Sequence, residues 1–526
     1  MNPGTWKLGD DPLGDHPTFL AHALAMSLRY GPGPWPEDAY RLPDDQPRPT
    51  GDEPFITSVV MDGIQSHHFG VKPDDDAVIE IADLLGRLVT DDPAHDDLLR
   101  LHDRLGTVSA LGIADGLVDQ IRRRRLPRDR IGAVGRHLAE YGTRRDAVKI
   151  GLVLLGACGD ERDRELLLLL GTLEELTLYA VVALQRTQPD RRRATYELAR
   201  RVRDWGRVHA VERLKGCDDP QIKDWLLREG FRNGIMNEYL AHLAATTGDL
   251  YSALLEPDVD DALLDGAADI LAALALGGPA EDMGDYADAV PAMHRLADLL
   301  VGGRATLGRL DAALRILAFL REPGDDSPWP SDMIARLRHR YEELVAQPRW
   351  NDLVLECLAD PHHADFSHAM WAADKLNLPV VPQIIARLKI DPLDEFAWRH
   401  AIGLATAEEA GQLVHLAGRL LPLTDLADIA DGPGDHLGLG EEYRPDRALE
   451  SVVSGLESFP GIGLALIEVA LRNRVTRIRR AALTALTTWP ASAVPDEARN
   501  LVRRAASVEP HEETRTEMID FLRRHP

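Results

Sequence analysis

Apolar residues recur at helical spacing in the stretch DWGRVHAVERLKG, residues 204–216. Asp204 is a residue type that favours the N-cap of a helix, and Gly216 is a type that commonly ends one. Between them, apolar positions fall on one helical face. They are Val208, Ala210, Val211 and Leu214. The pattern predicts a short amphipathic helix whose apolar stripe must be covered by a neighbour.

A second helix is predicted in PQIKDWLLREG, residues 220–230. The intervening CDDP breaks the helical pattern, and Pro220 suits a first helical turn because it has no N–H to leave unpaired. Gly230 suits the position just after a helix, where a left-handed backbone is common. One face carries Ile222, Trp225 and Leu226. The two runs together predict a helical hairpin.

The hairpin pattern recurs along the chain. RVHAVERL at 207–214 aligns with RRAALTAL at 479–486, and four other segments match more loosely. The matched alanines are Ala147, Ala180, Ala210, Ala372, Ala401 and Ala482. Several intervals between them are about thirty residues, the length of one hairpin, which predicts an all-α array of stacked repeats.

Three segments carry a family resemblance: RDAVKIGLVLLG, the hairpin at 204–230, and FPGIGLALIEVALRNRVTRIRRAALTAL. They resemble bacterial HEAT-repeat-containing proteins, and the resemblance covers roughly residues 110–525. It implies a HEAT-like α-solenoid, a right-handed superhelix of antiparallel helix pairs. It implies no particular activity, because such proteins are grouped by architecture.

The helical pattern is interrupted at the start of the chain and late in it. Residues 1–55 are rich in Pro, Gly and Asp, a composition that disfavours a long helix. We predict an acidic helical cap over 56–109, HEAT-like repeats over 110–426, and C-terminal repeats with a cap over 447–526. A Gly- and Asp-rich loop is predicted at 427–446. It lacks a Walker lysine and a preceding strand, which disfavours a nucleotide site there.

The composition predicts a cytoplasmic protein. The three cysteines of the 526 residues are too few and too scattered for a disulfide framework. The N-terminal MNPGTWKLGDDPLGDHP has no apolar core of a signal peptide, and no apolar run reaches the roughly 18 residues of a membrane span. Arginine far exceeds lysine, as in GC-rich bacterial genomes, so arginine content alone carries little functional weight.

Charge is distributed unevenly along this acidic chain, whose net charge is −26. Residues 122–215 carry 22 Lys and Arg against 13 Asp and Glu, whereas residues 1–119 and 216–300 are strongly acidic. The basic segment includes the runs Arg122–Arg125 and Arg191–Arg193. Such a segment either binds an anionic partner or pairs with carboxylates of neighbouring repeats, and we predict the second.

Two functions suit this architecture. The first is a non-catalytic scaffold or adaptor that binds another protein, because a solenoid offers a long surface without an active site. The alternative is a nucleic-acid-binding protein, such as a HEAT-like glycosylase that excises alkylated bases with Trp and Asp residues, although the net charge opposes phosphate binding. The predicted binding residues are Arg145, Asp204, Trp205, Arg207, His209, Arg191, Arg192 and Arg193.

Catalytic and metal-binding patterns are weak in this sequence. Histidines are densest in SHHFG, with His67 and His68, and in DPHHADFSH, with His362, His363 and His368. His and Asp side chains in the second segment are of types that bind zinc or iron, but its Asp-Pro start is typical of a turn between helices. No hydrolase, metalloprotease, dinucleotide or thiol motif occurs in a suitable context. We therefore predict no catalytic residue, no cofactor and no metal site.

Overall fold

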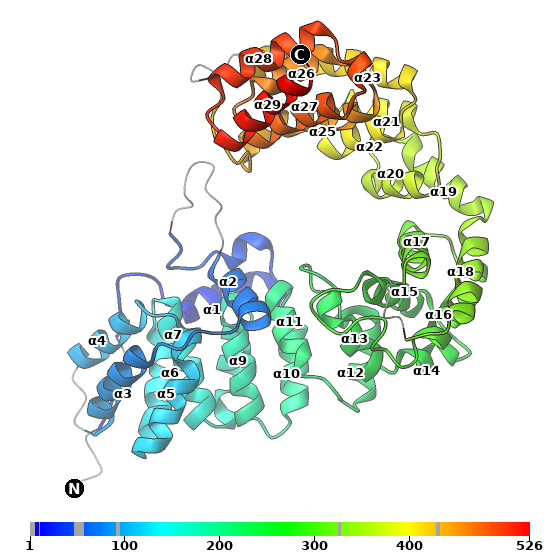
Figure 1. Cartoon of the computed structure of the whole chain (residues 1–526). Coiled ribbons are helices and arrows are strands. Elements are labelled where there is room, and N and C mark those ends of the chain that lie inside the picture. Colours follow the sequence, from blue (N-terminus) through cyan, green and yellow to red (C-terminus); the bar gives the residue numbers. More distant parts are fainter. Residues whose placement is uncertain are drawn as a thin grey trace. The chain divides into compact units, whose positions relative to one another are not determined.

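The computed structural model describes residues 6–9, 11–46, 57–90, 95–323, 328–427 and 432–525. Within these residues the chain is all-α, with 29 α-helices and a few short 3-10 and π-helical turns (Figure 1). Extended pairing in this part of the chain is limited to one isolated bridge between His436 and Val475. The predicted all-α class is confirmed.

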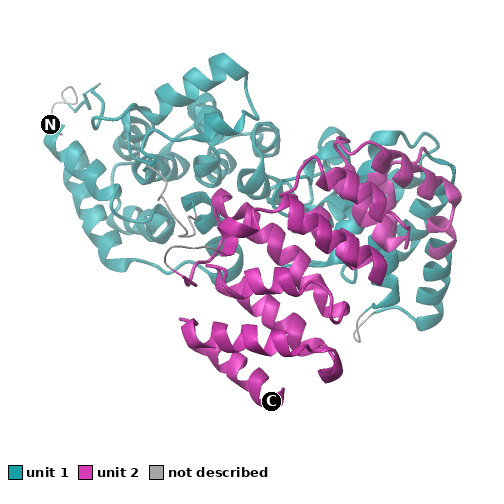
Figure 2. Cartoon of the chain, turned by 90° about the horizontal axis from the view of Figure 1, so that it is seen from above, with its two compact units in different colours: residues 1–47, 56–303, 315–341 teal, residues 48–55, 304–314, 342–526 magenta. Residues whose placement is uncertain are grey.

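The chain divides into two compact units (Figure 2). The first unit comprises residues 1–47, 56–303 and 315–341, and the second comprises 48–55, 304–314 and 342–526. Helices α17 (Leu307–Arg321) and α18 (Ser331–Val345) contain residues of both units.

The first unit holds the remaining N-terminal helices. They are α1 (Phe19–Tyr30), η1 (Glu37–Tyr40), α2 (Ser58–Ile64), η2 (Gln65–Phe69), α3 (Asp75–Thr90), α4 (His95–Leu105), α5 (Ala110–Arg124), α6 (Arg128–Tyr141), α7 (Arg145–Cys158), η3 (Glu161–Asp163), α8 (Arg164–Gly171), α9 (Glu174–Thr187), α10 (Arg191–Ala199), α11 (Asp204–Glu212), α12 (Pro220–Trp225), η4 (Leu226–Gly230), α13 (Glu238–Thr247), α14 (Leu250–Leu255), α15 (Asp261–Leu276) and α16 (Ala289–Gly302).

The second unit is also built of helices. They are α19 (Pro348–Ala359), α20 (Phe366–Lys375), α21 (Val381–Leu388), α22 (Glu395–Leu404), α23 (Ala407–Leu420), α24 (Leu423–Ala427), η5 (Glu441–Tyr443), α25 (Arg444–Gly455), η6 (Leu456–Ser458), α26 (Leu464–Leu471), α27 (Thr476–Thr488), η7 (Ala491–Ala493), α28 (Asp496–Val508) and α29 (Glu512–Arg524).

Helices close in sequence pack on each other because small residues lie at their contacts. In the first unit, α7 packs between α6 and α9. A Cβ placed on Gly135 of α6 would lie 2.8 Å from the Leu154 Cβ of α7, so only glycine permits this approach. All six alanines matched in the sequence are buried, with at most 2% of their surface exposed. Their predicted position at helix contacts agrees with this burial.

The hairpin at 204–230 forms with two corrections. Pro220 begins α12 as predicted, behind an Asp219 cap. Asp204 is not the N-cap but the first residue of α11, where its φ of +50° lets its N–H reach the Asn233 carbonyl. Gly230 does not adopt a positive φ. A Cβ there would lie 2.7 Å from the Trp225 ring, so close packing, not a left-handed cap, requires this glycine.

The N-terminal segment predicted to be irregular contains the 12-residue helix α1. Its sequence FLAHALAMSLRY holds no Pro or Gly, and the Thr18 side chain caps it by accepting the Ala21 N–H. The helix was not predicted because residues 1–55, taken as a whole, are rich in Pro and Gly. In the predicted loop at 427–446, Ala427 ends α24, residues 432–440 are irregular, and the last residues belong to η5 and α25.

Candidate functional site

One segment of the first unit runs across several of its helices. We call residues 57–74 the strap: they comprise α2, the π-helical turn η2 and the following five residues. Helix α2 lies against α9 and α11 (Figure 1). The strap ends where the Asp74 N–H donates to the Gly112 carbonyl of α5, 3.2 Å away. Its contacts bring together residues that are far apart in the sequence.

A buried ion-pair network holds the strap on α7 and α9. The Lys149 Nζ is 2.8 Å from Asp62 Oδ2 of the strap and 2.6 Å from Glu175 Oε1, with only 2% of Lys149 exposed. The Tyr179 ring lies 5.4 Å below the ammonium. Burial alone would lower the pKa of Lys149, but the carboxylates of Glu175, Asp62 and Asp146 together raise it above its ordinary value. Lys149 is therefore a charged anchor of the strap.

Arg145, a predicted binding residue, is occupied by structural contacts. Its guanidinium lies 2.7 Å from Asp44 Oδ1 and 2.6 Å from Asp45 Oδ1. It also donates to the Ser58 hydroxyl at the start of the strap, 2.8 Å away. A bidentate guanidinium held in this way has little capacity left for a ligand.

Trp205 anchors the middle of the strap. A Cβ on Gly63 would lie 2.3 Å from the Trp205 ring, so the strap backbone rests directly on the indole. The Trp205 N–H donates to Glu174 Oε1 at 2.9 Å. Burial, assisted by the nearby charge of Asp204, raises the pKa of Glu174 to about 7. The predicted binding residue Trp205 thus packs as core and joins the strap to α9 and α11.

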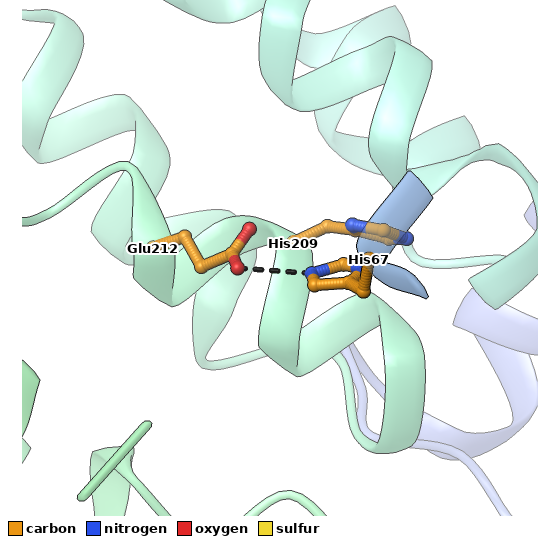
Figure 3. Close-up of side chains that lie close together, drawn as sticks. All are labelled: His67, His209 and Glu212. Carbon is orange, nitrogen blue, oxygen red and sulfur yellow. Dashed lines mark hydrogen bonds and ion pairs between the residues drawn. The ribbon is translucent and has the colours of Figure 1, made fainter. Parts of the chain in front are cut away.

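Two histidines and a glutamate meet beside this tryptophan (Figure 3). The His67 Nε2 of the strap is 2.9 Å from Glu212 Oε1 of α11, and its Nδ1 is 3.0 Å from the Gly63 carbonyl. The hydrogen bond to Glu212 raises the pKa of His67. His209, one turn before Glu212, is almost completely buried, and this burial lowers its pKa to about 3. The residues His67, His209 and Glu212 are called the His–His–Glu cluster below.

Aromatic rings surround His67. Its ring centroid lies 5.2 Å from Trp205, 5.3 Å from His209 and 5.5 Å from Tyr239 of α13. The next strap residue, His68, hydrogen-bonds the Tyr239 hydroxyl through Nε2 at 2.6 Å. The strap therefore reaches α13 as well as α11.

A cavity and a groove adjoin the strap. The cavity of about 390 Å³ is lined mainly by apolar side chains of α5, α7 and α9, with Ser66 of the strap and Arg213 also in its wall. The groove is open, has a volume of about 1090 Å³, and follows the strap itself. Cavity and groove share Val71, Pro73, Asp75 and Gly112. The cavity and the groove therefore adjoin each other at these residues.

The groove exposes large apolar side chains next to carboxylates. Phe69 is 80% exposed, and Met61 and Val71 are also exposed. Three acidic side chains line the same groove at Asp74, Asp75 and Asp76. Lys72 also lines the groove, so this surface combines apolar side chains with three carboxylates and one ammonium group.

The other predicted binding residues lie away from the groove lining. Arg207 is buried, donates to the Val202 carbonyl at 2.9 Å and packs over the Trp225 ring. Asp204 lies 3.5 Å from the Arg203 guanidinium. Trp205 and His209 of the predicted set lie together, with ring centroids 6.1 Å apart, and Asp204 is close enough to Arg207 for their charges to interact.

Arg191, Arg192 and Arg193 occupy the first turn of α10. Arg192 donates to the Gly216 carbonyl and Arg193 to the Gln221 side chain, and both also have a carboxylate within 4.0 Å. More than half of the basic side chains between 122 and 215 pair with carboxylates in this way. Examples are Arg124 with Asp83, Arg136 with Asp163, Arg144 with Asp103, and Lys215 with Glu281.

Two histidines of DPHHADFSH, His362 and His363, lie in a turn, as its Asp-Pro start indicates, whereas His368 belongs to α20. The Asp360 carboxylate accepts the His362 N–H, and the His363 ring accepts the Asp365 N–H. Within the described ranges, three side chains of metal-binding type come close together only in the His–His–Glu cluster. The spacing of His209 and Glu212, three residues apart on one helix, was visible in the sequence; the approach of His67 was not.

No protein-family model matches the chain, and no curated protein matches it. None of the described helices combines the length and apolar character that a membrane crossing needs. Function must therefore be inferred from the strap and the surfaces beside it.

Proposed function

We propose that this protein is a non-catalytic interaction scaffold of HEAT-like helix pairs that binds another protein in the cytoplasm. The proposed architecture, a right-handed superhelix of repeats, is supported by buried alanines at intervals of about thirty residues. Packing between helices close in sequence, such as α6 with α7, also supports it.

The exposed apolar groove along the strap carries the functional part of the proposal. Phe69, Met61 and Val71 expose apolar surface to water within eleven residues of chain, and Phe and Met are typical of interface centres. The three carboxylates of Asp74, Asp75 and Asp76 outnumber the single Lys72 in the groove lining, so the groove favours cations. The partner is therefore expected to present a segment that combines apolar side chains with Lys or Arg.

Nucleic-acid binding, the alternative, has less support from the contacts. Its proposed phosphate-binding arginines are largely neutralised by neighbouring carboxylates, as the pairs of Arg136 and Arg144 illustrate. A phosphate would have to displace a partner at each such arginine.

A peptide selection tests the proposal. Random 16-residue peptides displayed on phage are selected against the full chain, against Phe69→Asp, and against Leu28→Asp. Leu28 is the matched control, because it is 87% exposed but does not line the groove. The wild type and Leu28→Asp should enrich the same apolar and basic peptides, and Phe69→Asp should bind them at least tenfold more weakly. Equal binding by Phe69→Asp, or no enrichment, would exclude the groove as the binding surface.

A further inference from the structure

The His–His–Glu cluster has the composition of a metal site. One ligand atom from each of His67, His209 and Glu212 lies within 4.8 Å of the others (Figure 3). Residues three apart on a helix share a face, so α11 presents two of these side chains to the strap together. Two imidazoles and one carboxylate are the ligands of many zinc and iron sites that keep a position open.

His209 is the buried member of the cluster. Only 3% of its surface is exposed. Its ring lies beside His67, at a centroid distance of 5.3 Å. The buried His209 imidazole therefore lies close to both the His67 ring and the Glu212 carboxylate, within the distance that lets the three share one ion.

The contacts behind the cluster are those of metal ligands. The Nδ1–H of His67 can donate to the Gly63 carbonyl at 3.0 Å, which leaves Nε2 facing Glu212. The second oxygen of Glu212 lies 3.8 Å from the Arg213 guanidinium, which also donates to the His209 carbonyl. The contacts of His67 with Gly63 and of Glu212 with Arg213 are of the kind that orients metal-bound histidines and carboxylates, whereas the bond to the His209 backbone carbonyl does not orient its ring.

We propose that His67, His209 and Glu212 bind one divalent transition-metal ion, with Zn²⁺ as the best fit. The ion would be held by Nε2 of His67, one nitrogen of His209 and Oε1 of Glu212. Tetrahedral zinc with bonds of about 2.1 Å places its ligand atoms about 3.4 Å apart, so small side-chain rotations from the present arrangement suffice. This site is separate from the proposed peptide-binding groove and does not depend on it.

Metal titration of the full chain tests the site. The protein is stripped with a chelator and titrated with Co²⁺, whose visible d–d absorption reports its coordination, and Zn²⁺ then displaces it. One equivalent should bind, and the band should disappear as Zn²⁺ is added. Stoichiometric zinc should also raise the melting temperature, because it binds the folded chain.

Matched variants separate this site from zinc bound loosely by other histidines. Glu212→Gln and His67→Gln should each lower the affinity at least tenfold, whereas His68→Gln, which alters the neighbouring histidine, should leave it within twofold. Circular dichroism checks that each variant is folded; if one is not, the wild-type stoichiometry and the other variant decide. The proposal is overturned if the wild type gives no d–d band, or if the band is equally strong in Glu212→Gln and His67→Gln.

Discussion

At the residue scale, buried charged side chains determine how the strap packs in the first unit. Lys149 has carboxylates of the strap and of α9 within ion-pair distance, although almost none of its surface reaches water. Removing one member of a buried pair costs about 3–5 kcal/mol, because the remaining charge is left without a partner. Asp62 and Lys149 thus fix where the strap can lie.

The burial of Glu174 should make the stability of the protein depend on pH. Its pKa of about 7 lies above the ordinary 4.5, so the folded protein keeps this proton to a higher pH than the unfolded chain does. The stability from this group is therefore complete below about pH 4.5 and is lost as the pH rises through 7. We expect wild type to lose about 2 kcal/mol between pH 5 and 8 from this group, after screening of a partly exposed side chain.

Thermal melting of wild type and Glu174→Gln at pH 5 and pH 8 measures this loss. The glutamine keeps an acceptor for the Trp205 N–H but cannot ionise, so the variant should gain stability relative to wild type at pH 8. Glu457→Gln changes an exposed glutamate and serves as the control. Parallel pH profiles for wild type and Glu174→Gln would show that Glu174 ionises freely in the folded state.

Only some residues of the site could be predicted from the sequence. Trp205 and His209 were selected because they lie on an evident amphipathic helix. Their partner His67 is 145 residues from Glu212 in the chain, and no local pattern reports a contact over that separation. Arg145 and Arg207 were selected for their charge, which does not distinguish a buried structural guanidinium from a ligand-binding one.

At the element scale, apolar periodicity predicted helices well. The average composition of a long segment, in contrast, failed to predict a helix within it. The hairpin at α11 and α12 follows directly from its apolar spacing, and so do the buried matched alanines. Helix α1 was missed because its twelve helix-favouring residues lie in a Pro- and Gly-rich region. The position of the strap on α9 and α11 could not be predicted from the sequence, because it depends on tertiary contacts of α2 rather than on a local pattern in residues 57–74.

Gly63→Ala should loosen the strap. Its new Cβ would lie 2.3 Å from the Trp205 ring, so either the indole or α2 must move, at a cost of about 1–3 kcal/mol. Limited proteolysis with chymotrypsin should then cut faster at Phe69. Gly403→Ala is the control, because a Cβ there meets no atom within 4 Å. Unchanged cleavage in Gly63→Ala would mean that the strap is not held by Trp205.

At the scale of the whole molecule, the uneven charge is largely paired internally. Arginines of the basic segment meet carboxylates on neighbouring helices, and the same holds in the second unit. There Arg479 is buried with Glu509, and Arg474 lies 2.8 Å from Asp446. After this pairing, the chain keeps a large excess of negative charge, with a net charge of −26.

Duplex DNA should therefore bind only weakly. We expect no sub-micromolar binding in a fluorescence anisotropy titration at physiological salt, where charges are screened over about 8 Å. The triple variant Arg191→Ala, Arg192→Ala and Arg193→Ala should bind no differently from wild type. Tight, salt-sensitive binding that the triple variant loses would contradict the scaffold proposal and favour the nucleic-acid alternative.

The strap also has a consequence for how the chain is synthesised. Its histidines bind residues 145 and 171 positions later, at Glu212 and Tyr239. At about 5–20 residues per second, the ribosome needs roughly 10–30 s to make that length of chain. During this interval the strap has emerged but α11 and α13 have not, so Phe69 and its apolar neighbours are available to chaperones that hold nascent chains.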